Sequence, residues 1–171
     1  MSKEITWKTD CEGVDFERVA GIMKDAGLSS LDGRTQEKVF RRSWSVVFPF
    51  DGDRVIGCGR ALSDGICQAA IYNIAVDPSY QGFGLGRQII ERLLESVRGC
   101  TTILYTHPQT VKFYEELGGW HRQKTGFVNY NGGTDDEHFK WLKDSGFILP
   151  DGFRYENDES ENYPIPGKER R

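Results

Sequence analysis

A glycine-rich loop between an apolar strand and an amphipathic helix is the feature that most restricts how this chain can fold. Residues 81–86 read Gln-Gly-Phe-Gly-Leu-Gly. Glycines at alternate positions let successive backbone N–H groups face one point without interference from Cβ atoms. A helix is predicted to begin in this loop, so its first N–H groups and the positive end of its dipole act on the same point. The loop therefore indicates an anion site that fits a diphosphate.

Two familiar diphosphate-binding loops do not match this segment. A dinucleotide-binding loop has the spacing G-x-G-x-x-G, and here Arg87 occupies the position of the third glycine. Residues 101–107 also offer no acidic side chain to hold a ribose. A P-loop requires Gly-Lys-Ser/Thr, which the segment lacks. A purely structural role for this glycine-rich turn is the remaining alternative.

The order of the predicted elements indicates an α/β fold. Strands are predicted over residues 43–50, 54–62 and 69–76, and the short turns between them favour an antiparallel meander. An amphipathic helix over residues 87–98 and a strand over 101–105 then complete a βαβ crossover. We therefore predict a mixed sheet, a meander followed by a crossover, that is flanked by helices.

Further elements are predicted on both sides of this unit. Asp15 suits the N-cap of a helix whose apolar residues recur at helical spacing, and a second helix is predicted over residues 35–42. Pro108 opens another helix, because proline is favoured in a first turn. A last strand is predicted over residues 126–130 and a last helix over 135–145.

The composition changes near residue 133. We predict one folded domain over residues 1–133 and a C-terminal extension over 134–171, which is helical at first. From residue 157 the extension is polar and interrupted by prolines, and it is predicted to be loosely ordered. Three roles stay open for it: covering an acceptor site, mediating a homodimer, or remaining solvated.

Composition and charge exclude several classes of function. The net charge of -4 and the pI near 5.4 give no sequence-wide excess of basic residues that would indicate binding to nucleic acid. No apolar run is long enough to span a membrane, and the first residues contain no apolar signal core, so a cytoplasmic location is expected. The cysteines show neither metal-ligand nor disulfide spacing, so we expect reduced thiols and no metal. These cysteines are Cys11, Cys58, Cys67 and Cys100.

The chain resembles the Gcn5-related N-acetyltransferase (GNAT) superfamily. The coenzyme A motif of that family reads R/Q-x-x-G-x-G/A, and Gln81, Gly84 and Gly86 match it in register. Residues 73–78 look like the family's fourth strand and its exit, and residues 110–118 resemble its A-x-x-F-Y-x-x-x-G segment. The glycine loop alone is weak evidence, but the three segments at proper separations are specific.

This resemblance extends over about residues 46–130, and it implies an enzyme that uses acetyl-CoA as cosubstrate to acetylate an amine. It implies Tyr114 as the general acid that protonates the departing thiolate. His107 stands where the family often has an asparagine at the cofactor. Residues Gly118, Gly119 and Trp120 replace the family's usual Gly-Phe. The residues implied at the cofactor are Ile74, Ala75, Val76, Gln81, Gly82, Phe83, Gly84, Leu85, Gly86, Arg87 and His107.

The resemblance leaves the general base and the acceptor open. Family members with a base on the fourth strand carry it at positions that match Ala70 and Tyr72, and neither residue suits that role near neutral pH. Asp64 is interpreted as a turn residue. A looser likeness of residues 56–73 to aralkylamine, serotonin-type acetyltransferases favours a small primary amine as the acceptor. A protein lysine or N-terminus and a non-catalytic coenzyme A-binding module are the alternatives.

Overall fold

The computed structural model describes residues 5–123, 126, 137–144 and 146–149. The chain divides into two units, residues 1–105 and residues 106–171, and each unit is described by itself. The domain boundary expected after residue 133 lies outside the described residues and stays a prediction.

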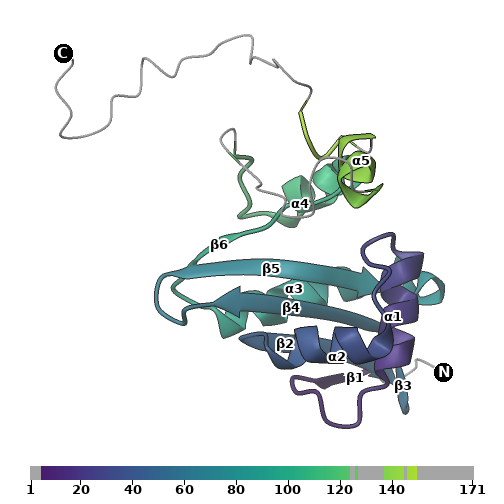
Figure 1. Ribbon diagram of the computed structural model, residues 1–171. Coiled ribbons are helices and arrows are strands. Elements are labelled where there is room, and N and C mark those ends of the chain that lie inside the picture. The colour runs from purple at the N-terminus through teal and green to yellow at the C-terminus, as the bar shows by residue number, and fades with distance from the viewer. Residues whose placement is uncertain (1–4, 124–125, 127–136, 145, 150–171) are drawn as a thin grey trace, which may run out of the picture. The chain divides into compact units, whose positions relative to one another are not determined.

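The first unit is built on one six-stranded mixed sheet (Figure 1). The strands follow the order β1-β2-β4-β5-β6, and β3 pairs with β2 at one end. Because β2, β4 and β5 pair antiparallel and β6 joins β5 in parallel, the predicted meander and crossover are confirmed. The strands are β1 (Ile5–Lys8), β2 (Ser45–Asp51), β3 (Arg54–Val55), β4 (Gly57–Ser63), β5 (Gln68–Val76) and β6 (Thr101–Ile103).

Three elements differ from the sequence-based expectation. Strand β1 was not predicted, because four residues carry little periodicity and this strand pairs with the distant β2. The strand expected over residues 54–62 is divided into β3 and β4, and Ile56 between them donates its N–H to the carbonyl oxygen of Pro49 at 2.9 Å. Gly126 lies in no strand, and the rest of the strand expected over 126–130 lies outside the described residues.

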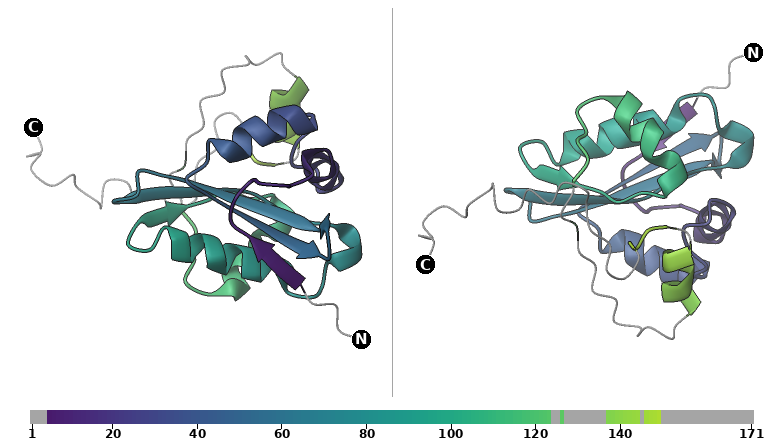
Figure 2. Two further views of the ribbon diagram at one scale, coloured as in Figure 1. Left: turned by 90° about the horizontal axis from the view of Figure 1, so that it is seen from below. Right: turned by 90° about the horizontal axis from the view of Figure 1, so that it is seen from above.

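Helices cover both faces of the sheet (Figure 2). Helix α3 (Leu85–Ser96) packs on one face, while α1 (Phe16–Asp25) and α2 (Gly33–Arg41) pack on the other. Asp15 and Asp32 cap the last two by accepting backbone N–H groups at 3.0 and 2.7 Å. The core under α1 and α2 centres on the rings of Phe16, Phe40 and Phe48, whose centroids lie 5.2 to 6.0 Å apart.

The described part of the second unit is helical. The 3-10 turn η2 (Pro108–Thr110) opens with its proline as predicted and leads into α4 (Val111–Leu117). Helix α5 (Glu137–Asp144) lies inside the helix expected over residues 135–145. On α4, Phe113 is exposed, and Tyr114 and Leu117 are half-buried. No helix in the described part of the chain is long and apolar enough to cross a membrane.

Helix α3 approaches β4 so closely that a side chain at Gly59 has no space. A Cβ atom there would lie 2.4 Å from Cγ2 of Ile89 and 2.8 Å from Cδ1 of Ile74. We expect Gly59→Ala to lower the free energy of unfolding by about 1 to 3 kcal/mol, because overpacking forces side chains out of their rotamers. Urea unfolding measures this change.

Gly21→Ala is the matched control, because a Cβ atom at Gly21 in α1 meets nothing within 4 Å. It should stabilise the protein by about 0.5 to 1 kcal/mol, as alanine does in a helix interior. Equal stability of the Gly59→Ala variant and the parent would contradict the close approach of α3.

Candidate active site

The glycine loop has the shape that an anion site requires. Gly82 and Gly84 adopt positive φ angles of 83° and 78°, and a Cβ atom at either position would meet nothing within 4 Å. Gly84 is the N-cap of α3, and no side chain caps the helix there. The first helical bond runs from the N–H of Gln88 to the carbonyl oxygen of Gly84 at 3.2 Å. The N–H groups of residues 85–87 therefore have no acceptor within the helix and fit a diphosphate.

Gln81 joins this loop to the end of β5. Its side-chain amide donates a hydrogen bond to the carbonyl oxygen of Val76 at 3.1 Å. Phe83 and Arg87 are exposed at the edge of the loop, and the side chain of Leu85 is buried. Gln81 thus fixes where the loop leaves the strand, and its own contact with a cofactor stays a prediction.

Strand β5 contains a bulge opposite Gly59. Cys58 pairs with Ala75 and Arg60 pairs with Tyr72, so two residues of β5 oppose one residue of β4. The two residues are numbers 73 and 74. An extra residue of this kind leaves backbone groups unpaired within the sheet and bends the strand, which is why bulges recur beside active sites.

Asn73 supplies the conformation that the bulge needs. Its φ of 58° is the only positive φ of a non-glycine residue in the described ranges, and asparagine tolerates this region better than most residues. Nε of Arg60 donates to its side-chain oxygen at 2.5 Å, and the thiol of Cys58 donates to its backbone oxygen at 3.5 Å. The sequence reasoning missed this residue, although an asparagine inside an apolar strand is itself a signal of irregularity.

One edge of β5 is open beyond its third residue. Strand β5 has nine residues, but β6 pairs only with Gln68, Ala69 and Ala70. From residue 71 to residue 76, no strand among the described residues pairs with β5 on that side. The backbone of Ile74, Ala75 and Val76 lies on this stretch, and an extended ligand that carries amides can pair with such an edge.

The predicted general acid and one predicted cofactor contact lie in the second unit. Tyr114 is half-buried, and its ring lies 5.1 Å from that of Phe113 and 6.0 Å from that of Trp120. Burial raises the pKa of Tyr114 above 10, and a hydrogen bond from Thr106 only partly offsets the effect. The phenol is therefore protonated at neutral pH and able to donate a proton.

His107 is the N-cap of η2 in the structure. Its Nδ1 accepts the N–H of Gln109 at 3.2 Å, and its ring contacts that of Phe147 at a centroid distance of 5.3 Å. The expected contact between His107 and a cofactor stays a prediction, and the cap accounts for the residue within its own unit.

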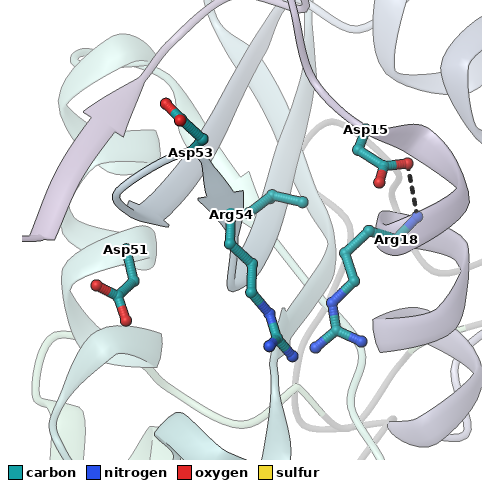
Figure 3. A pocket seen from close by; sticks show the side chains of 6 residues that line it. Asp15, Arg18, Asp51, Asp53 and Arg54 are labelled. Carbon is teal, nitrogen blue, oxygen red and sulfur yellow. Dashed lines mark hydrogen bonds between the residues drawn. The ribbon is translucent and has the colours of Figure 1, made fainter.

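A cavity of about 560 Å³ lies beside the start of α1 (Figure 3). The guanidinium groups of Arg18 and Arg54 point toward one another there, and the carboxylate of Asp15 accepts the backbone N–H of Arg18. No residue predicted for the site lines this cavity. Its lining consists of Asp15, Arg18, Asp51, Asp53, Arg54 and Val55.

The buried carboxylate of Asp77 pairs with both of these arginines. Its Oδ2 atom accepts from Arg18 and, at 3.1 Å, from Arg54, and its Oδ1 atom accepts the N–H and hydroxyl of Ser79 at 3.0 and 2.9 Å. Burial would raise the pKa of Asp77, but the bonds from Ser79 and the two arginine charges outweigh burial and lower it. Asp77 therefore anchors the segment that leads from β5 to the glycine loop.

Comparison with known proteins agrees with this geometry. Residues 43–118 match the family model described as an acetyltransferase (GNAT) domain. Residues 43–118 form a GNAT domain. The matched residues run from the start of β2 through the bulge and the glycine loop to the end of α4, so both features described above belong to the GNAT domain.

Several plant proteins are similar to the chain over this domain. GCN5-related N-acetyltransferase 1, chloroplastic, of Arabidopsis thaliana is 43% identical over 63% of this chain and 57% of its own length. Serotonin N-acetyltransferase 2, chloroplastic, of Oryza sativa subsp. japonica is 41% identical over 38% of this chain and 34% of its own length. Histone acetyltransferase TAP1 of Glycine max is 44% identical over 38% of this chain and 29% of its own length. The chain thus spans just over half the length of the first relative and about a third of the others.

Solved structures share the fold. A candidate acetyltransferase from Deinococcus radiodurans R1 superimposes with a TM-score of 0.66 and 28% identity, over 73% of this chain and 87% of that one. The mixed α/β sheet flanked by helices is therefore the GNAT fold, as the sequence predicted.

Asp77→Asn tests the anchor of the loop. We expect this variant to lower the free energy of unfolding at pH 7 by about 1 to 3 kcal/mol. The loss should be smaller than for a fully buried ion pair, because both arginines keep partial access to water. Since folding lowers the pKa of Asp77 below 3.8, its contribution is present above that pH and is lost as the pH falls through the folded pKa. The difference between parent and variant should therefore shrink at pH 3.

Urea unfolding at pH 7 and pH 3 measures both effects. Asp53→Asn is the control, because this exposed carboxylate lines the same cavity, and its effect should stay within about 0.5 kcal/mol. A loss from Asp77→Asn that is equal at the two pH values would contradict the role of the charge.

Proposed function

We propose that the chain is an N-acetyltransferase that moves the acetyl group of acetyl-CoA to the primary amine of a small molecule, by direct attack of the amine on the thioester. The observation that carries this proposal is the continuity of two features. The open edge of β5, which includes the bulge, ends at Val76. The hydrogen bond from Gln81 to Val76 connects this end of the strand to the glycine loop. An extended thioester that ends in a diphosphate fits such a series of backbone groups.

Acetyl-CoA supplies an activated acyl group and a thiolate leaving group. In the proposed mechanism the N–H groups at the start of α3 bind its diphosphate, and the backbone of Ile74, Ala75 and Val76 aligns its amide-containing arm. The N–H of Ala75 or Val76 stabilises the charge that develops on the carbonyl oxygen, and a single donor of this kind is worth on the order of 3 kcal/mol in other enzymes. Tyr114 donates the proton that the departing sulfur requires.

No general base is assigned for the acceptor amine. Asp64 is a poor candidate, because its carboxylate accepts the N–H groups of Ile66, Cys67 and Gln68 at 2.8, 2.9 and 3.1 Å. These bonds lower the pKa of Asp64 and hold it in the turn between β4 and β5, as its interpretation as a turn residue predicts. The proposal therefore has the amine react in its neutral form, after losing its proton to water.

The name of the rice relative, a serotonin N-acetyltransferase, supports a small amine as the acceptor. The name of the soybean relative, a histone acetyltransferase, supports a protein lysine, so a protein acceptor is the second candidate. A coenzyme A-binding module without catalysis is the third. A homodimer and a cytoplasmic location are also proposals, and the names of two relatives point to the chloroplast as the alternative location.

Gly84→Asp and Gly84→Asn together test the diphosphate site. The two side chains have the same shape and bear the same strain at a φ of 78°, but only aspartate puts a negative charge at the N-terminus of α3. We expect the aspartate variant to bind acetyl-CoA at least about tenfold more weakly than the asparagine variant, because like charges repel at the site. Calorimetric titration measures this ratio, and equal affinities would place the diphosphate elsewhere.

The proposed acid predicts the behaviour of Tyr114→Phe. Release of free thiol from acetyl-CoA is measured over aromatic amines, polyamines, amino acids and lysine peptides. One class of amine should be turned over, and Tyr114→Phe should lower kcat by about 10²- to 10⁴-fold while acetyl-CoA binding stays unchanged. Because the raised pKa keeps the phenol protonated, kcat should not fall on account of this residue until the pH exceeds 10.

Trp120→Phe is the control for Tyr114→Phe, since it alters a ring that packs on Tyr114 and keeps the hydroxyl. An unchanged kcat in Tyr114→Phe would refute the acid role. Turnover of lysine peptides alone would favour the protein acceptor, and binding of acetyl-CoA without any turnover would favour the non-catalytic module.

A further inference from the structure

Arg60 is a half-buried cation beside the bulge of β5. It lies on β4, two residues after Cys58, whose side chain belongs to the core under α1 and α2. Its guanidinium lies over the ring of Tyr72 at 5.2 Å from the centroid. Nε donates to Asn73 at 2.5 Å, and Nη1 donates to the hydroxyl of Ser43 at 3.5 Å. Arg60 thus faces the α1 and α2 side of the sheet, next to the proposed reaction centre.

The hydrogen-bond partners of this cation are an amide oxygen and a hydroxyl group. No carboxylate of the described residues forms an ion pair with Arg60, and its Nη2 atom makes no hydrogen bond to any of them. The titratable groups that act on it are Tyr72, Tyr105 and Cys58. Burial lowers the pKa of Arg60, and these groups do not fully compensate.

A partly desolvated charge of this kind is normally paired in a protein. The chain has 26 acidic residues, more than its 22 basic ones, but none of those in the described ranges pairs with Arg60. By contrast, Arg18 and Arg54 share the buried carboxylate of Asp77. With respect to the residues that the structure describes, Arg60 therefore keeps N–H donors that an added anion can accept from.

Arg60 also lies near the place where the acceptor is proposed to react. Arg60 pairs with Tyr72, which is three residues before Ala75. At about 3.3 Å per residue, its place on the strand lies within about 10 Å of the backbone groups proposed to polarise the thioester. An amine that attacks at the bulge could hold a second group against Arg60 without leaving this face of the sheet.

We propose that Arg60 binds a carboxylate or phosphate of the acceptor, so that the preferred acceptors are amines that carry an anionic group a few bonds from the nitrogen. This inference rests on the proposed acetyl transfer and specifies its acceptor. The planar guanidinium can offer two parallel N–H groups to such an anion, and the ring of Tyr72 holds the plane in place.

Matched pairs of acceptors test this proposal on the whole chain. Thiol release is compared between phenylalanine and phenethylamine, and between phosphoethanolamine and ethanolamine. The parent protein should show a KM about 10- to 100-fold lower for the anionic member of at least one pair, as expected for a hydrogen bond to a charged group. Arg60→Gln should remove this difference while turnover of the neutral member persists.

Two further variants separate charge from structure. Arg60→Lys keeps the positive charge without the paired N–H groups, and it should retain part of the preference. Arg98→Gln removes an exposed arginine that lies beyond the end of α3 and pairs with Glu95. This variant should leave the preference unchanged. The comparison within the parent protein needs no variant and stands even if Arg60→Gln fails to fold.

Failure of this inference is distinguishable from failure of acetyl transfer. Turnover of the neutral amines without an Arg60-dependent preference overturns the role of Arg60 alone. If no amine is turned over, the proposed activity fails. Calorimetric titration in the presence of coenzyme A then tests Arg60 directly, with 3-phenylpropionate and its neutral amide as probes. The carboxylate should bind the parent at least about tenfold more tightly than it binds Arg60→Gln, and equal affinities would overturn the proposal.

Discussion

An extra residue in β5 determines how the rest of the site is arranged. Side chains along a regular strand alternate between its two faces, so Tyr72 and Ala75 would lie on opposite faces. The bulge puts both on the face of Arg60 and Cys58, their partners on β4. It also turns Ile74 toward α3, where the absence of a side chain at Gly59 leaves space for it. The register shift, the close packing of α3 and the left-handed Asn73 are therefore parts of one local structure.

Different side chains hold the two ends of the β5 segment that runs from the bulge to Val76. At the bulge, Arg60 holds the amide oxygen of Asn73 and keeps further donors available. At the exit, the buried carboxylate of Asp77 fixes the first turn after the strand, and Gln81 returns to Val76. The glycine loop then begins at a fixed point, so that the positive end of α3 can act on an anion. The matched GNAT domain includes both ends.

Local patterns were sufficient to predict the meander, the crossover and the loop. The apolar strands with short turns, the helical periodicity after residue 86 and the alternating glycines are all features of neighbouring residues. The GNAT resemblance, drawn from the loop, the preceding strand and the helix with Phe113 and Tyr114, is confirmed by the family match. The catalytic role of Tyr114 stays a prediction, and His107 has a capping role within its own unit.

Features that depend on distant pairs could not be predicted from the sequence. Strand β1 exists because it pairs with β2, whose partner residues lie 40 to 46 positions later in the sequence. Arg18 and Arg54 lie 59 and 23 residues from Asp77, and nothing in the spacing of charges connects them. A bulge breaks the alternation that strand prediction relies on, so its position appears only when both strands are seen in register.

The most direct test of the account follows the acetyl group itself. The full chain is incubated with acetyl-CoA that carries a ¹³C-labelled acetyl group and with the panel of amines, and the products are examined by mass spectrometry. The account predicts an amine that carries the labelled acetyl group on its nitrogen, formed only in the presence of the protein. Bound but unreacted acetyl-CoA, or labelled acetate as the sole product, would contradict transfer to an amine.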